Sequence, residues 1–289
     1  MKETAKKGLR GVAARVPGRG KQRGGESVET KRGKAPPSRQ EEGRQLLEEL
    51  KVRGAVVFRE VIHLGPQVLR LARAVQTGVK PLKDDDPEGA PLDLLLRLSE
   101  GLGFEGSYVN ILRGAAKSFA TKGFEAVVIQ DILDSAGVSP RTFYQFFANK
   151  GEVLAALYDL VIYVWTDAMR TGLESKKASA TDKLQHTIAT ILGGYAIAGD
   201  LVRVLETEAV RPGSPLRPLE RERMRRECEW IGPVLSEIRG TKLTDEWVRL
   251  RIAAVRAAAL ELGLGAHSTE QDLIRGGMLL TQLLGVGEK

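Results

Sequence analysis

The chain of 289 residues has few cysteines, histidines and aromatic side chains. Its single cysteine, Cys228, excludes an intramolecular disulfide framework and a multi-cysteine zinc site, and this usage predicts a cytoplasmic protein. His63, His186 and His267 lie too far apart for metal-ligand spacing, so we expect no metal and no cofactor. Because no apolar run approaches the roughly 20 residues of a membrane-spanning helix, we expect no transmembrane segment. Residues 1–40 also lack the apolar centre of a secretory signal.

The net charge of +7 is distributed very unevenly. Residues 1–40 hold twelve lysines and arginines against three glutamates, whereas residues 41–106 carry a net −3 and residues 107–289 a net +1. The first 40 residues also lack apolar periodicity, which predicts a disordered basic arm. Such an arm holds DNA loosely through phosphate neutralisation and counterion release. A solvated extension without a role is the alternative interpretation.

Helical spacing of apolar residues begins near Gln45 and recurs along the rest of the chain. Gly65-Pro66 should interrupt the first run, and an acidic linker over 77–91 precedes a short helix that begins at Pro91. We therefore expect an accessory helical segment over 41–104. An all-α fold is predicted beyond it, with helices over 108–121, 128–135, 139–146, 150–175, 181–198, 200–209, 218–238, 245–263 and 269–284.

A helix-turn-helix is predicted over residues 128–147. Gly137 permits the left-handed conformation of a tight corner between two short helices, and Val138 fills that corner with an apolar side chain. Ser139 is a natural N-cap and Pro140 a natural first residue of the second helix. The second helix of such a pair enters the major groove of DNA. This spacing therefore predicts a DNA-binding element.

The second helix of this element carries side chains that suit DNA contact. Phe143, with Phe146 or Phe147, should anchor the helix to the core and leave polar groups on the outer side. An arginine can bond guanine bidentately, a glutamine can bond adenine, and hydroxyl groups can hold phosphate oxygens. A lysine where the next helix begins would clamp the DNA backbone. The predicted DNA-binding residues are Ser139, Pro140, Arg141, Thr142, Tyr144, Gln145 and Lys150.

Residues 105–165 resemble the DNA-binding domain of the TetR family of bacterial transcriptional regulators. The resemblance starts with the motif I-L-x-x-A-A-x-x-F at Ile111 and continues without a gap to Asn149-Lys150. Val127 and Val128 depart from the family pattern, which has hydroxyl side chains at the start of the second helix. Since valine neither caps a helix nor reaches a phosphate, we expect weaker DNA affinity from the folded domain, which the basic arm would offset.

The resemblance implies a homodimer that binds double-stranded DNA at a pseudo-palindromic operator and responds to an unknown small-molecule effector. It implies a bacterial repressor that is cytoplasmic and nucleoid-associated, and not an enzyme. Residues 166–289 would form the helical effector-binding and dimerisation domain, with the last two helices at the dimer interface. Each side chain suggested for the effector pocket also fits ordinary core or surface packing; these side chains are Trp165, Met169, Tyr195, Arg203 and Trp230.

Two further sequence patterns are interpreted as structural features and not as binding sites. Gly101 to Gly106 spells GxGxxG, but a helix is expected before it where a dinucleotide site needs a strand, so we interpret it as a linker. The alternating arginines and glutamates over 220–229 are interpreted as a solvated helix face with i,i+4 ion pairs. An architectural DNA-coating protein led by the basic arm and a helical enzyme remain the alternative functions.

Overall fold

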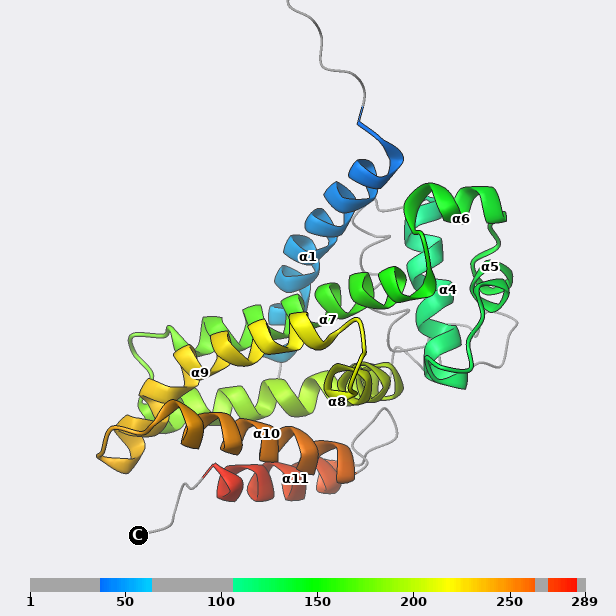
Figure 1. Cartoon of the computed structure of the whole chain (residues 1–289). Helices are drawn as coiled ribbons and strands as arrows, with labels where there is room; N and C mark the ends of the chain where they lie inside the picture. Colours follow the sequence, from blue (N-terminus) through cyan, green and yellow to red (C-terminus); the bar gives the residue numbers. More distant parts are fainter. Residues whose placement is uncertain (1–36, 64–105, 263–269, 285–289) are drawn as a thin grey trace, which may run out of the picture. The chain divides into compact units, whose positions relative to one another are not determined.

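The computed structural model describes residues 37–63, 106–262 and 270–284, and every element in these ranges is an α-helix (Figure 1). The all-α prediction is therefore confirmed for this part of the chain. The expectations for Gly65-Pro66, for the acidic linker over 77–91, for the short helix from Pro91, for residues 101–105 and for the arm before Pro37 lie outside the described ranges. The helices are α1 (Arg39–His63), α4 (Ser107–Lys122), α5 (Ile129–Ala136), α6 (Pro140–Phe146), α7 (Lys150–Leu173), α8 (Ala180–Val210), α9 (Arg217–Arg239), α10 (Asp245–Glu261) and α11 (Glu270–Leu283).

Helices α4, α5 and α6 pack around one apolar centre on the first turns of α7. A side chain at Gly114 would bring its Cβ within 2.7 Å of the backbone nitrogen of Ala136, so the glycine permits the close approach of α4 and α5. The apolar stripe that the sequence places on the inner side of α4 is buried throughout. This centre contains fully buried side chains from all four helices, among them Ile111, Phe119, Ile132, Phe143 and Leu154.

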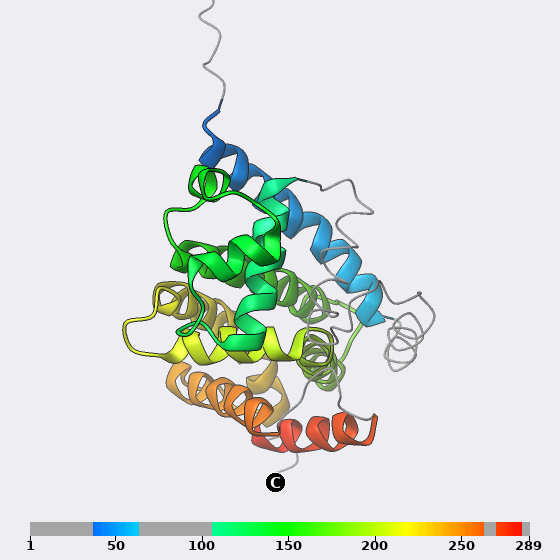
Figure 2. The same ribbon diagram turned by 90° about the vertical axis from the view of Figure 1, so that its right-hand side faces the viewer.

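Helix α7 joins this small unit to the remaining helices, because it packs against α4 and also against α1, α8 and α9 (Figure 2). Its apolar positions are buried along nearly the whole length, from Val153 to Leu173. Helices α10 and α11 pack against each other, α10 also against α9 and α11 also against α8. A helix buried on several sides is well placed to carry a displacement from one group of helices to another.

The helix bounds follow the sequence expectations closely in most places. The break expected between the helices over 181–198 and 200–209 occurs as a change of direction, since α8 bends by 106° between Ala180–Tyr195 and Gly199–Val210. Helix α9, expected over 218–238, continues through Pro233 to Arg239. In the described ranges no single helix is long and apolar enough to cross a membrane, and the arms of α8 reach that measure only as a bent pair.

The accessory segment starts earlier than expected. Arg39 and Gln40, which the sequence assigns to the basic arm, are the first residues of α1. The reason is local, because Ser38 caps this helix: its hydroxyl accepts the backbone N–H of Glu41 at 3.2 Å, and the Glu41 carboxylate accepts the N–H of Ser38 at 3.1 Å.

Candidate nucleic-acid interface

Helix α5 begins without a side-chain cap from its N-cap residue, Val128. Val127 is fully buried and Val128 is largely exposed, so neither supplies the hydroxyl that this position would use. Asp131 instead provides a side-chain hydrogen bond at the start of the helix. Its carboxylate accepts the N–H of Val128 at 2.9 Å and a hydrogen bond from the ammonium of Lys122 at 2.6 Å. These hydrogen bonds, the one from Lys122 first, lower the pKa of Asp131. The start of α5 is thus tied to the end of α4 by charge.

The corner between α5 and α6 has the geometry that the sequence predicts. Gly137 adopts the left-handed conformation, with φ of 63° and ψ of 34°, and ends α5. Ser139 caps α6, because its hydroxyl accepts the backbone N–H of Thr142 at 3.1 Å, and Pro140 is the first helical residue. The predicted cap residues of the helix-turn-helix are confirmed.

Helix α6 is anchored on one side by aromatic rings and exposed on the other. Phe143 and Phe147 are buried, and Phe146 is half-buried against them. The ring of Tyr108 on α4 stacks on Phe147 at 5.2 Å and meets Phe146 edge-on at 5.5 Å between centroids. This anchoring fixes the rotation of α6 about its axis.

The residues predicted to touch DNA are accordingly on the outer side. Arg141 and Gln145 are exposed, and 54% of the Tyr144 surface is accessible. Thr142 is half-buried, and its hydroxyl lies 2.9 Å from that of Ser139, so both hydroxyls also serve the cap. Residues 141, 144 and 145 share one helix face at i, i+3 and i+4. An arginine, a tyrosine and a glutamine on one exposed face have the hydrogen-bonding groups that DNA recognition requires.

Lys150 lies differently from the sequence expectation. Its ammonium donates to three backbone carbonyls of the segment that follows α4: Phe124 at 2.9 Å, Glu125 at 3.0 Å and Val127 at 2.7 Å. It also lies 4.7 Å from the centroid of the Phe124 ring. An ammonium has three hydrogens, and all three are used here inside the protein. We therefore revise its predicted role from a clamp on DNA to a residue that holds this segment against the start of α7.

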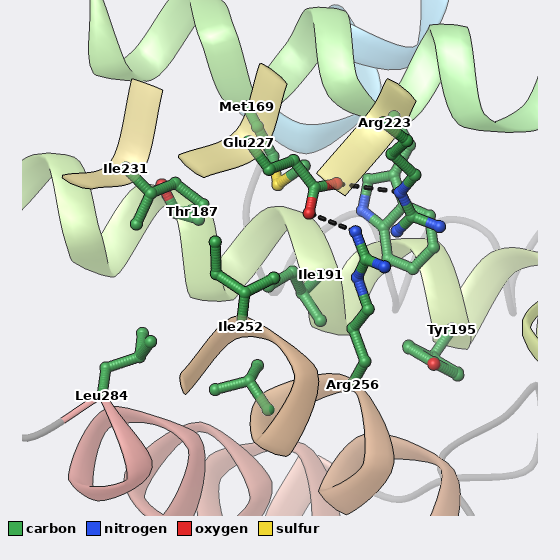
Figure 3. A pocket seen from close by; sticks show the side chains of 12 residues that line it. Met169, Thr187, Ile191, Tyr195, Arg223, Glu227, Ile231, Ile252, Arg256 and Leu284 are labelled. Carbon is green, nitrogen blue, oxygen red and sulfur yellow. Dashed lines mark hydrogen bonds and ion pairs between the residues drawn. The ribbon is translucent and has the colours of Figure 1, made fainter. Parts of the chain in front are cut away.

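A second candidate site is a small cavity among α7, α8, α9, α10 and the end of α11 (Figure 3). Of the five side chains suggested for an effector pocket, Trp165, Met169 and Tyr195 line it. Arg203 is exposed and Trp230 is half-buried, and neither lines the cavity, because their positions on α8 and α9 face elsewhere. The space at its centre is only about 20 Å³, enough for a water molecule.

One wall of the cavity is charged, which the sequence analysis did not foresee. Glu220, Arg223 and Glu227 of α9 are buried rather than solvated, so the interpretation of 220–229 as a solvated face is wrong for these three residues. It holds for the exposed arginines of the same run, since Arg225 and Arg226 pair with Glu222. Positions 220, 223 and 227 lie on one face of the helix. The sequence did not distinguish this face from the exposed faces, because all of them carry charged residues.

These residues belong to a buried charge cluster, defined as Glu206, Glu220, Arg223, Glu227 and Arg256. The guanidinium of Arg223 donates to Glu227 at 2.8 Å and to Glu206 at 2.5 Å, and Arg256 donates to both Glu220 and Glu227. Burial disfavours the charged form of Glu227, but Arg256 and Arg223 outweigh it and lower its pKa. For Arg223 burial is likewise outweighed, by Glu206 first, so its pKa is raised. Through these ion pairs the cluster joins α8, α9 and α10.

The aromatic side of the cavity contains a polar group without a partner. Tyr195 is 1% exposed, and its hydroxyl has no hydrogen-bond partner among the described residues. Its ring meets that of Trp165 edge-on at 5.5 Å, and the Trp165 indole N–H donates to the carbonyl of Thr190 at 2.9 Å. A buried hydroxyl without a partner is costly, and it marks a place where a ligand or a water would be bound.

Comparison with known proteins agrees with the helix-turn-helix geometry. Residues 111–157, from the second turn of α4 into the first third of α7, match the sequence model of bacterial regulatory proteins of the tetR family. None of the curated proteins matches the chain. Proteins of this family are bacterial regulatory proteins. On the matched residues and their geometry, this chain contains a DNA-binding domain similar to that of tetR-family regulators and is a DNA-binding transcriptional regulator.

Proposed function

We propose that the protein is a ligand-responsive repressor that binds one pseudo-palindromic operator as a homodimer. The observation that carries the proposal is the state of α6: it is capped by Ser139, anchored by Phe143 and exposed at Arg141 and Gln145. In this proposal Arg141 bonds a guanine and Gln145 bonds an adenine, while the hydroxyls of Thr142 and Tyr144 hold phosphate oxygens.

The homodimer follows from the geometry of duplex DNA. Two recognition helices must meet successive major grooves about 34–36 Å apart, which requires two copies related by a two-fold axis. Exposed apolar side chains on the last two helices support an interface there: Leu250 on α10 is 67% exposed, and Met278 on α11 is 64% exposed. In the proposed dimer a second copy of the chain covers these side chains.

The ligand response rests on the cavity and on its link to α7. Trp165, Met169 and Tyr195 offer an apolar and aromatic lining with one unused hydroxyl. Because the central space is small, a bound effector must displace the surrounding helices. A ligand that prefers such a displaced arrangement shifts the population of the dimer away from the spacing that fits DNA.

The division of the chain follows from this mechanism. Residues 105–165 would be the DNA-binding domain and residues 166–289 the effector-binding and dimerisation domain, with α7 shared between them. A regulator of this kind acts at the bacterial nucleoid, in the cytoplasm.

Selection of bound fragments from random-sequence DNA, followed by footprinting, tests the proposal. We expect enrichment of one short inverted repeat, protection of both half-sites, and two chains per site by sedimentation. Binding that increases only with DNA length, without sequence enrichment, would instead favour an architectural DNA-coating protein.

A further inference from the structure

The recognition helix, α6, is too short to hold its own orientation. It has seven residues, and isolated helices shorter than about 12 residues are marginal in water. Its direction therefore depends on the elements that pack against it, and α4 and α1 are two of these. Helix α1 lies outside the residues that match the tetR-family model, so that comparison assigns it no role.

The first turns of α1 lie beside α6 in both views of the fold (Figure 1, Figure 2). Gly43 is buried there, and a Cβ on this residue would lie 2.8 Å from the Tyr108 ring and 3.3 Å from the Phe146 ring. Tyr108 in turn stacks on Phe147, the residue that ends α6. Any larger residue at position 43 would displace these rings, so the backbone of α1 lies directly on the ring cluster that anchors α6.

The inward positions of α1 form one stripe along the helix. Those that are buried or half-buried after its first turn are Gly43, Leu46, Leu47, Leu50, Lys51, Gly54 and Ala55. They recur every three to four residues, which places them on one face. That face begins at α6 and continues along α7, so a single unbroken helix joins the two.

The later turns of α1 are fixed to α7 at two points. The ammonium of Lys51, a residue that is only 7% exposed, donates to Asp159 of α7 at 2.9 Å and to a glutamate one turn earlier on α1. Further along, a Cβ on Gly54 would lie 3.1 Å from the Val164 side chain, so the two helices approach closely there. A buried lysine paired with two carboxylates specifies one docked position of α1 along α7.

From these contacts we infer that α1 is a positioning element of the DNA-binding domain: it fixes α6 to residues 159–164 of α7, in the orientation in which Arg141 and Gln145 face the duplex. The inference rests on the proposed function for the DNA itself. Gly43 and Lys51 are then positioning residues, because they act on recognition through α6 and α7 and not by contact with DNA.

The same attachment bears on the ligand response. Trp165, which directly follows the segment 159–164, lines the cavity among α7, α8, α9 and α10. An effector that displaces this part of α7 would move α6 through α1, in addition to the direct connection between α6 and α7 at Asn149.

The first test compares full-length variants on two duplexes, one carrying the operator selected by the natural chain and one of random sequence. Gly43→Leu places a side chain against the rings of Tyr108 and Phe146. Its matched control, Gln45→Leu, places the same side chain on the exposed face of α1. Circular dichroism selects the folded variants, and stoichiometric titration gives their active fraction.

The attachment to α7 is tested with Lys51→Met and with the double variant Lys51→Met/Asp159→Leu. The single variant leaves Asp159 without its lysine, whereas the double variant replaces the ion pair by two apolar side chains. Such a replacement preserves packing, and the double variant also keeps the net charge of the natural chain. It should therefore recover the operator preference that the single variant loses.

We expect Gly43→Leu to weaken operator binding about tenfold or more, the equivalent of one lost base contact, and to change random-duplex binding by less than about twofold. Gln45→Leu should bind like the natural chain. Equal losses on the two duplexes, or an unchanged operator preference in folded Gly43→Leu, would overturn the inference and leave α1 as a stabilising helix. A double variant that recovers nothing would overturn the attachment to α7. Should Gly43→Leu not fold, Gly43→Ala replaces it, since its Cβ alone meets the Tyr108 ring.

A distance measurement without DNA separates this inference from the proposed function. Spin labels on Arg141→Cys of α6 and Gln185→Cys of α8, both exposed positions, are introduced in a Cys228→Ser chain and diluted with unlabelled chain. We expect the natural sequence and Gln45→Leu to give the same distance distribution, and Gly43→Leu a shifted or broader one. Identical distributions in all three would overturn the inference. A natural chain that selects no operator overturns the proposed function, and the label distances then still decide whether α1 fixes α6.

Discussion

The hydroxyl of Tyr158 on α7 donates a hydrogen bond of 2.6 Å to Glu220 on α9, and both side chains are buried. Tyr158 directly follows the residues that match the TetR family, so this bond links the helix that leaves the DNA-binding domain to the buried charge cluster. Arg223 of that cluster lies 3.4 Å from the same hydroxyl and also lines the cavity. A ligand that moves the Arg223 side chain in the cavity therefore displaces a group that contacts Tyr158 of α7.

Two tyrosine-to-phenylalanine variants should have opposite effects on stability. Tyr158→Phe leaves a buried carboxylate with one donor fewer, so we expect the free energy of unfolding to fall by about 1–3 kcal/mol. Tyr195→Phe removes a hydroxyl that has no partner in the part of the chain that the structure describes, so we expect no loss or a small gain. Urea unfolding measures both, and equal losses in the two variants would contradict the hydrogen-bond assignment.

Two arginines of α9 should differ sharply although they are two residues apart. Arg223→Met leaves the buried Glu206 without its arginine partner and leaves Glu227 with Arg256 alone, which should cost about 3–5 kcal/mol of unfolding free energy. Arg225→Met removes exposed ion pairs that water and salt screen, so it should cost much less unfolding free energy than Arg223→Met. Chemical denaturation of the two variants gives the comparison, and similar losses would mean that the 220–229 run is solvated throughout.

The buried cluster should make the protein sensitive to acid. The folded-state pKa of Glu227 is depressed from an ordinary value of 4.5, so its contribution to stability is present above about pH 4.5 and is lost as the pH falls through the folded-state pKa. Glu227→Gln is expected to unfold more easily at pH 7 but to show a shallower loss of stability below pH ~4.5. Unfolding curves over a pH series would show this, and parallel acid limbs would argue against it.

Arg141→Ala should reduce affinity for the selected operator by on the order of 1–3 kcal/mol, with most of the loss confined to one base position. The side chain is exposed, so the thermal unfolding midpoint should not change. Arg221→Ala, which removes an exposed arginine of α9, is the matched control. Equal loss on operator and random duplexes would remove Arg141 from base recognition.

Lys150→Met should act through the fold and not through direct contact with DNA. Three carbonyls of the segment after α4 lose their donor, so we expect the unfolding free energy to fall by about 1–3 kcal/mol. The exposed Lys176→Met serves as control. If the stability were unchanged and the salt slope of DNA binding fell by about 1, Lys150 would instead be a phosphate contact.

The helix-turn-helix was predictable because its determinants are local. Ser139 and Thr142 form a cap across three residues, and Gly137 ends a helix by its own backbone conformation. For the same reason the bounds of α5 and α6 lie within one residue of the expectation, and Phe143 is buried while Arg141 is exposed.

The charged side chains were predictable only in part. Sequence spacing identified ion pairs within α9 but not which of them face the core, because a run of alternating charges has no apolar stripe to mark the inner side. The partners of Arg256 lie 29 and 36 residues away, and those of Lys150 lie 23 to 26 residues away. No local pattern encodes such distances.

The amino-acid sequence alone thus determined the helices, the caps and the exposed face of the recognition helix, since these depend on interactions between residues a few positions apart. Only the tertiary structure decided which charges are buried, where Lys150 donates its hydrogens and how α1 docks beside α6. Those outcomes depend on how whole helices pack, and packing sets the local dielectric and the available partners of every polar group.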